Sequence, residues 1–216
     1  MGNLKKRGLL IVTNLAYNKK SFLEILEQIQ VDNLHMLINY LEKETDFFNA
    51  PASTRFHGNY EGGLVEHSLH VYSNMLRKNN EKPWADFNYT FTTIVITSLL
   101  HDVCKSNFYE VDYKNVKQYS DNGKFTDTKG KYDWCVSPYY TINDKFPYGH
   151  GEKSVEIITR FITLLECEKM AIRWHMGFSE PKENWGTLGK AIEKYPLILM
   201  LHEADMEATY IDEVER

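Results

Sequence analysis

The sequence has no excess of basic charge. Its 216 residues include 25 Lys and Arg against 30 Asp and Glu, which gives a formal net charge of -5 at pH 7. Proteins that follow a nucleic-acid backbone usually present a basic face and have a high isoelectric point. The composition therefore argues against an extended nucleic acid as a partner. It leaves open a small anionic substrate that a few local cations would bind.

The sequence also has few cysteines and no long apolar run. Cys104, Cys135 and Cys167 are scattered and form no CxxC pair, which favours free thiols in a reducing cytoplasm. The apolar segment at residues 8–12 is too short for a secretory signal, and no run reaches the roughly 18 residues of a membrane span. We therefore expect a soluble, cytoplasmic protein with no membrane partner.

Low-complexity stretches and internal repeats are absent as well, and 216 residues fit a single domain. We expect one domain over residues 1–216, and the sequence leaves a homo-oligomer open. Within it we predict a helical extension at 1–50, a helical metal-binding core at 51–108 and 148–216, and a β-like insertion at 109–147.

Most of the chain has helical periodicity. Apolar residues that recur at three- and four-residue steps predict helices over residues 21–43 (with a break near Val31), 64–78, 89–103, 151–165, 168–176, 188–194 and 196–214. Residues 109–147 differ, because aromatic and polar residues alternate there between turn signals such as Asp121-Asn122-Gly123. The predicted fold class is an all-α helical bundle with a small β-hairpin or irregular insertion.

The pair His101-Asp102 stands at the end of a strongly apolar segment and is the first candidate for chemistry. A buried carboxylate without a partner costs several kcal/mol, and a divalent cation would satisfy the carboxylate and the imidazole together. Imidazole with carboxylate suits Mn, Fe, Zn or Ni, whereas a mostly oxygen set suits Mg. The pair therefore predicts a bound divalent metal ion of open identity.

Further candidate ligands lie on or directly before other predicted helices, as is common for metal sites in helical bundles. They are His67 in Gly62-Gly63-Leu64-Val65-Glu66-His67, His150 in Gly149-His150-Gly151, His175 in Trp174-His175-Met176, and Asp205 in Leu201-His202-Glu203-Ala204-Asp205.

The order of these six residues resembles the HD superfamily of metal-dependent phosphohydrolases, in its six-ligand branch. The local strings are most similar to the HD domain of bacterial 3'-to-5' exoribonucleases. The resemblance implies an HD-type helical bundle that holds one or two divalent metal ions per chain, in a binuclear site when two are bound. It implies that His67, His101, Asp102 and Asp205 bind one metal, and that His150 and His175 join a bridging Asp102 to bind a second.

Four cations near these motifs are candidates for binding the substrate phosphate: Arg55, Lys105, Lys153 and Arg173. Lys105 follows Asp102 by three residues and would share its helical face. We predict Asp102 and Lys105 as the catalytic residues. For each cation, a solvated surface charge is the alternative.

For four other residues, a role at the site and a purely structural role both stay open. His70 and His202 fit donors that orient ligands, but a satisfied core histidine is favoured. Trp134 and Tyr139 fit a lid over a nucleobase, although plain packing is favoured.

The leading interpretation is a phosphohydrolase or phosphodiesterase that cleaves a phosphate ester of a nucleotide or other small phosphorylated substrate by metal-activated water, with manganese among the candidate metals. Three alternatives stay open: a 3'-to-5' exonuclease on short oligonucleotides, a di-iron oxygenase of the HD superfamily, and a non-catalytic nucleotide sensor. Iron content and oxygen consumption would identify the oxygenase.

Overall fold

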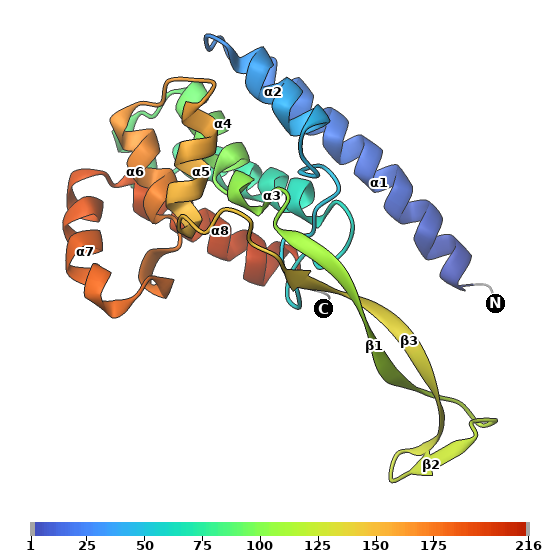
Figure 1. The fold of residues 1–216 in the computed structure, drawn as a ribbon. Helices are drawn as coiled ribbons and strands as arrows, with labels where there is room; N and C mark the ends of the chain where they lie inside the picture. The colour runs from blue at the N-terminus through green and yellow to red at the C-terminus, as the bar shows by residue number, and fades with distance from the viewer. Residues whose placement is uncertain (1–2, 215–216) are drawn as a thin grey trace.

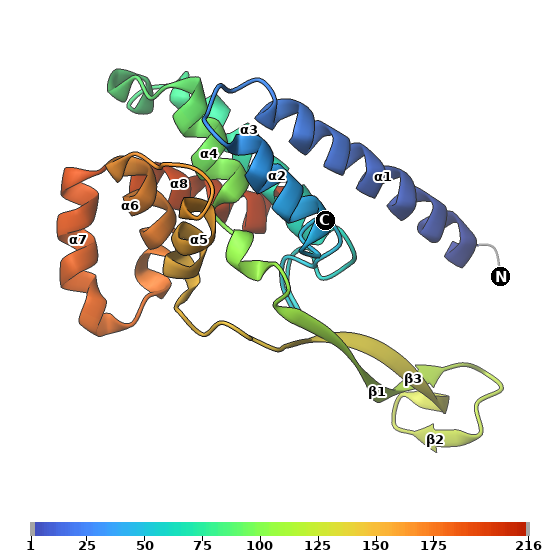
Figure 2. The same ribbon diagram turned by 45° about the horizontal axis from the view of Figure 1, so that its top comes forward.

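The computed structural model describes the backbone of residues 3–214 and the side chains of residues 15–214. A body of helices carries one long β-ribbon that projects away from it (Figures 1 and 2). The helices are α1 Asn3–Leu26, α2 Leu34–Lys43, α3 Gly63–Asn79, α4 Phe91–Leu100, α5 His150–Thr159, α6 Glu166–Trp174, α7 Trp185–Lys194 and α8 Leu197–Glu207. The strands are β1 Tyr109–Tyr119, β2 Phe125–Asp127 and β3 Gly130–Ile142.

Helix α4 lies at the centre of the helical body. Thr90 caps its start, because its hydroxyl oxygen accepts a hydrogen bond from the Thr93 backbone N–H at 3.1 Å. Every residue of α4 from Thr93 to Leu100 is buried. A helix that is apolar on all sides is expected to be covered on all sides. The end of α4 therefore places the residues that follow it in the interior.

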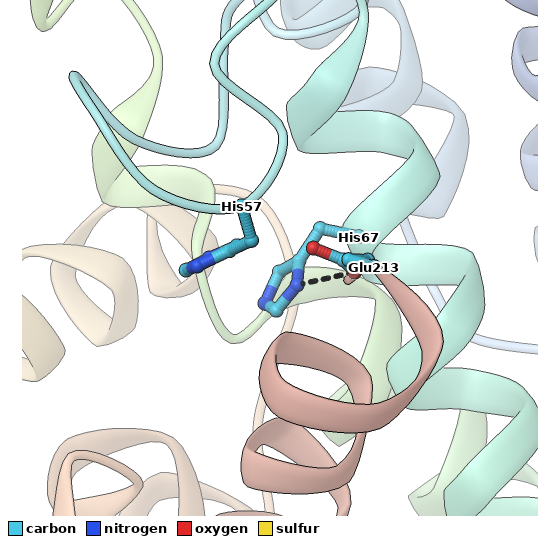
Figure 3. Close-up of side chains that lie close together, drawn as sticks. All are labelled: His57, His67 and Glu213. Carbon is cyan, nitrogen blue, oxygen red and sulfur yellow. Dashed lines mark hydrogen bonds and ion pairs between the residues drawn. The ribbon is translucent and has the colours of Figure 1, made fainter. Parts of the chain in front are cut away.

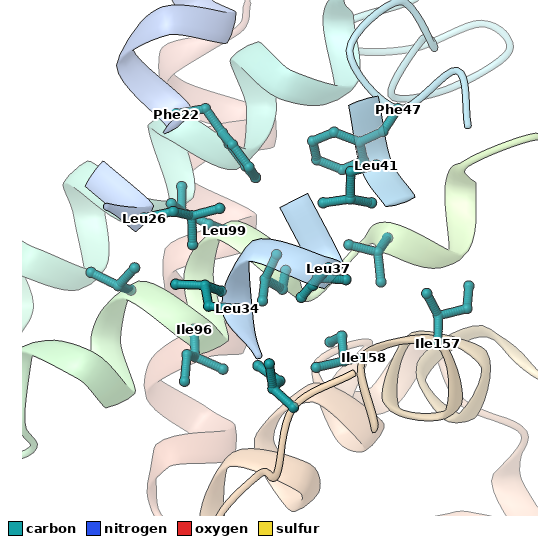
Figure 4. Close-up of a cluster of buried hydrophobic side chains, with 14 of the residues drawn as sticks. Phe22, Leu26, Leu34, Leu37, Leu41, Phe47, Ile96, Leu99, Ile157 and Ile158 are labelled. Carbon is teal, nitrogen blue, oxygen red and sulfur yellow. The ribbon is translucent and has the colours of Figure 1, made fainter. Parts of the chain in front are cut away.

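Two apolar clusters meet at α4. The larger one joins Phe22 and Leu26 of α1 to Leu37 of α2 and Leu99 of α4, together with residues of α3, α5 and α6 (Figure 4). The second joins Ile94 on another side of α4 to residues of α3, α6 and α8. Residues of the predicted N-terminal extension thus contribute to the main core.

The N-terminal helices differ from the predicted one in their bounds. The expected break near Val31 is present between α1 and α2, but α1 begins at Asn3 rather than near Ser21. No helix in the described part of the chain is both long and apolar enough to cross a membrane.

The predicted all-α fold class is wrong, because the chain contains a three-stranded antiparallel sheet of order β1-β3-β2. Strands β1 and β3 pair along their length, from Tyr109 opposite Ile142 to Tyr119 opposite Tyr132. Residues 109–142 are rich in Tyr and Val, which suit a pleated surface. The helices and the sheet together give a mixed fold, in which the sheet is larger than the small hairpin that we expected.

Candidate metal centre

The six residues that the sequence singles out come from five different parts of the helical body. His67 is on α3, and His101 and Asp102 directly follow α4. His150 opens α5, His175 directly follows α6, and Asp205 is on α8. His67, His101, Asp102 and His175 are each at most 2% exposed. The burial of α4 explains this for the His101-Asp102 pair, since the pair continues from an apolar helix.

The Asp102 carboxylate lies at the centre of the group, and its two oxygens face different histidines. Oδ2 is 3.5 Å from His101 Nε2 and 3.8 Å from His67 Nε2. Oδ1 is 2.8 Å from His150 Nε2 and 3.4 Å from His175 Nε2. One carboxylate thus stands between two pairs of imidazole nitrogens.

Asp205 completes the group from α8. Its Oδ1 lies 3.1 Å from His67 Nε2. Possible ligand atoms of His101, His175 and Asp205 also lie within 4.8 Å of one another, as do those of His67, His101 and Asp102 and those of Asp102, His150 and His175. The structure therefore brings all six predicted residues together.

The histidine rings are oriented by hydrogen bonds on their outer nitrogens. His101 Nδ1 lies 2.8 Å from the Ser98 carbonyl oxygen, and His175 Nδ1 lies 2.7 Å from that of Ile172. A carbonyl only accepts, so each Nδ1 carries the proton and each Nε2 offers a lone pair to the cluster. This is the arrangement that metal-binding histidines usually have.

The inner nitrogen of His67 faces Asp205, whereas those of His101 and His175 are buried and have no hydrogen-bond partner among the described residues. Buried polar atoms are nearly always satisfied, so two such atoms beside one carboxylate need an explanation. A divalent cation would accept these lone pairs and the carboxylate charge together. The residues present therefore fit a metal ion.

Lys105 provides a positive charge beside the cluster. Its Nζ lies 2.6 Å from Asp102 Oδ2, and its side chain is 14% exposed. Burial alone would raise the pKa of Asp102, but the nearby Lys105 ammonium and His101 hold it well below its usual range. Burial opposes the charged form of Lys105 too, and the Asp102 carboxylate nevertheless raises the pKa of its ammonium.

The other predicted substrate contacts differ in their surroundings. Lys153 is buried, with its Nζ 2.6 Å from Asp144 Oδ1. Arg173 forms ion pairs with Glu152 at 2.5 Å and with Glu180 at 2.8 Å. Arg55 is exposed, and no described carboxylate forms an ion pair with it. The assignment of these cations to a substrate stays a prediction, for which Arg55 has the most accessible charge.

Glu213 belongs to the site and was missed by the sequence reasoning. Its Oε1 lies 2.9 Å from His67 Nδ1 (Figure 3). The same oxygen lies 3.0 Å from His70 Nδ1. Burial would raise the pKa of Glu213, but the contacts with these histidines lower it to about 2. Burial would likewise lower the pKa of His67, but Asp205 and Glu213 raise it to about 9. No motif spacing marks Glu213, which directly follows the π-helical segment Ala208–Asp212 that continues α8.

Two further histidines surround the cluster. His57, in the loop before α3, has its ring centre 4.9 Å from that of His67 (Figure 3). Both of its ring nitrogens are buried, and neither has a hydrogen-bond partner among the described residues. His202 Nδ1 lies 2.8 Å from the His175 carbonyl oxygen, so this histidine fixes the backbone of a candidate ligand.

No protein-family model, curated protein or solved structure matches the chain. The geometry of the site shows a buried group of histidine and aspartate side chains that could hold a metal ion.

Proposed function

We propose that the chain is a metal-dependent phosphohydrolase that cleaves a phosphate ester of a nucleotide or another small phosphorylated substrate. The observation that carries the proposal is the position of the Asp102 carboxylate between two pairs of histidines. Its Oδ2 faces His67 and His101, and its Oδ1 faces His150 and His175. A carboxylate in that position suits a bridge between two cations. The resemblance of the motifs to the HD superfamily supports the same interpretation.

The donor set indicates which residues would hold which ion. His67, His101, Asp102 and Asp205 would hold one, and Asp102 with His150 and His175 would hold the other. A set of imidazoles and carboxylates suits Mn, Fe, Zn or Ni better than Mg. Such ions, when bound, supply hydroxide near neutral pH by lowering the pKa of a bound water, and they stabilise charge on phosphoryl oxygens.

The residues of the chain contribute positioning and charge. The carbonyls of Ser98 and Ile172 hold the rings of His101 and His175 in place before any ligand binds. Prearranged groups cost little reorganisation during a reaction. Lys105 adds a fixed ammonium next to Asp102, and such a charge attracts an anionic substrate to this place.

The test is turnover by the purified protein with added Mn²⁺ on mononucleotides, nucleoside triphosphates, cyclic nucleotides, cyclic dinucleotides and a short RNA. We expect cleavage of one class, with a loss of more than about a hundredfold in Asp102→Asn, comparable to removing one strong electrostatic contact. Asp86→Asn is the matched control, because Asp86 is exposed and pairs only with Lys82 at 3.6 Å among the described side chains.

Equal activity of wild type and Asp102→Asn would contradict the proposal. Bound iron with oxygen consumption, and no cleavage of any phosphoester, would instead favour the oxygenase alternative. The same protein preparation therefore separates the two enzyme classes.

A further inference from the structure

The loop of residues 54–60 separates two hollows in the surface. One has a volume of about 500 Å³ and is lined by His57 and Glu213, the two residues that lie against His67. The other has a volume of about 650 Å³ and lies between the loop and the part of the β-ribbon nearest to the helices. We call the second one the ribbon-base hollow; Arg55, Tyr60, Lys114, Tyr139 and Tyr140 are among its lining residues.

The two hollows share part of their walls. Arg55, Asn59 and Tyr60 line both of them. A ligand bound beside His57 would therefore need only to follow the loop to enter the ribbon-base hollow. Pockets of a few hundred Å³ are typical of small-molecule sites, so the volume suits about one nucleotide.

The ribbon-base hollow combines cations with aromatic rings. Arg55 and Lys114 line it, and no carboxylate is among its described lining residues. Lys114 Nζ lies 4.8 Å from the centre of the Tyr139 ring. The Tyr139 hydroxyl donates to Asp112 Oδ2 at 3.0 Å, which fixes the ring in place. Aromatic faces stack on bases of any sequence, and guanidinium and ammonium groups bind phosphate.

The loop that presents Arg55 is held by its own hydrogen bonds. The Phe56 N–H donates to Ser53 Oγ at 2.9 Å, and the Ser53 hydroxyl donates to the His57 carbonyl at 2.7 Å. The Ala52 N–H donates to the Gly58 carbonyl at 2.9 Å. A loop fixed in this way loses little freedom when a ligand binds, so less binding free energy is lost in ordering it.

We propose that the ribbon-base hollow binds the base of a nucleotide substrate and a phosphate other than the scissile one. The inference deepens the proposed function, because the scissile phosphate would lie at the metal centre on the other side of the loop. It names the substrate class as a nucleotide with at least two phosphate groups. A simple phosphomonoester without a base would leave the tyrosines and one cation of the hollow uncontacted.

Binding is measured by calorimetry on the Asp102→Asn protein in EDTA, so that neither turnover nor metal contributes. The probes are the nucleoside triphosphates, dinucleotides and inorganic tripolyphosphate. We expect one nucleotide to bind at least tenfold more tightly than tripolyphosphate. Arg55→Ala and Tyr139→Ala should each weaken nucleotide binding about tenfold. Tyr139→Phe should weaken it less than Tyr139→Ala, because the ring remains although its hydrogen bond to Asp112 is lost.

Lys131→Ala is the matched control, since Lys131 is an exposed cation of the same ribbon that does not line the hollow. Thermal unfolding of each variant shows whether it folds. The inference is overturned if every nucleotide binds no tighter than tripolyphosphate, or if Arg55→Ala and Tyr139→Ala bind like Lys131→Ala. If nucleotide binding depends on Arg55 and Tyr139 but the protein cleaves no phosphoester, the proposed function is wrong and the ribbon-base hollow is still a nucleotide-binding site.

Discussion

For single residues, the main question is which nitrogen of each histidine faces the cluster. The Ser98 and Ile172 carbonyls decide this for His101 and His175, and the Glu213 carboxylate has the same position at His67. Such partners fix the ring and raise its basicity as a ligand. They therefore influence metal affinity without touching the metal.

Glu213→Gln tests this influence. The substitution keeps the size of the side chain but removes the charge beside His67 Nδ1, so we expect metal affinity to fall about 10- to 100-fold. Competition with a chelating dye measures it. Asp212→Asn is the control, because the neighbouring Asp212 contacts Asn74 at 2.8 Å. Similar affinities for Glu213→Gln and Asp212→Asn would show that Glu213 does not support the ligand.

Metal affinity should also depend on pH. In the metal-free protein the pKa of His67 is raised to about 9, so this ring is protonated at neutral pH. A metal binds the neutral ring and must displace the proton, so affinity rises as pH increases towards 9 and falls as pH decreases. Dye competition at pH 6, 7 and 8 checks the direction. An affinity that is constant over this range would contradict it.

The sequence predicts some residues of the site better than others. His101 and Asp102 follow an apolar helix, and their burial is a direct consequence of that position. His67, His150, His175 and Asp205 are candidates from their places beside predicted helices, and the HD resemblance adds which metal each would bind. The structure places them around Asp102. Glu213 could not be predicted, because its contact with His67 depends on how the chain turns after α8.

Among the elements, the distance between α5 and α6 determines where two candidate ligands lie. His150 opens α5 and His175 directly follows α6. Gly151 of α5 lies against the backbone of α6, since a Cβ there would lie 2.2 Å from the Arg173 carbonyl oxygen. A backbone oxygen has little freedom to move away, so glycine is required for this packing.

Gly151→Ala should therefore displace α5, lower the unfolding temperature and reduce metal affinity. Gly189→Ala is the matched control, because a Cβ at Gly189 in α7 meets no atom within 4 Å. There we expect a gain of about 0.4–1 kcal/mol, since alanine restricts the unfolded chain. Chemical denaturation and dye competition measure both variants. If Gly151→Ala were as stable as Gly189→Ala, close packing of α5 on α6 would not be needed for the stability of the fold.

The elements also show where the sequence-based fold prediction failed. Helical periodicity was informative where one side of a helix faces the core, as in α3 and α5. The β-ribbon has apolar side chains on both faces, such as Tyr113 and Val136 on one and Val116 and Tyr139 on the other. Apolar side chains therefore do not mark one buried face of the sheet, and its size was underestimated.

At the scale of the whole molecule, the ribbon stands away from the helices (Figures 1 and 2). Its outer side chains contact one another, as Tyr132 does with Trp134 and Phe125. Trp134 is 51% exposed and Val136 68% exposed. We therefore expect the outer ribbon, residues 117–134, to contribute little to the stability of the helical body or to metal binding.

Replacing residues 117–134 with Asn-Gly, which joins the register partners Val116 and Cys135 in a two-residue turn, tests this independence. We expect the unfolding temperature to stay within about 2 °C, since 1 kcal/mol moves it by roughly 2–4 °C in a protein of this size. Nucleotide binding should also persist, because Lys114 and Tyr139 remain. A large fall in the unfolding temperature would show that the outer ribbon supports the helices.

The metal content of the protein tests the central claim most directly. The protein is saturated with Mn²⁺, desalted and analysed by mass spectrometry of its metals, with Asp102→Asn and Asp86→Asn beside it. We predict up to two ions per chain in the wild type and in Asp86→Asn, and a loss of bound metal in Asp102→Asn. Equal metal content in all three proteins, or none in any of them after loading with Mn, Fe, Zn or Ni, would contradict a metal centre at Asp102.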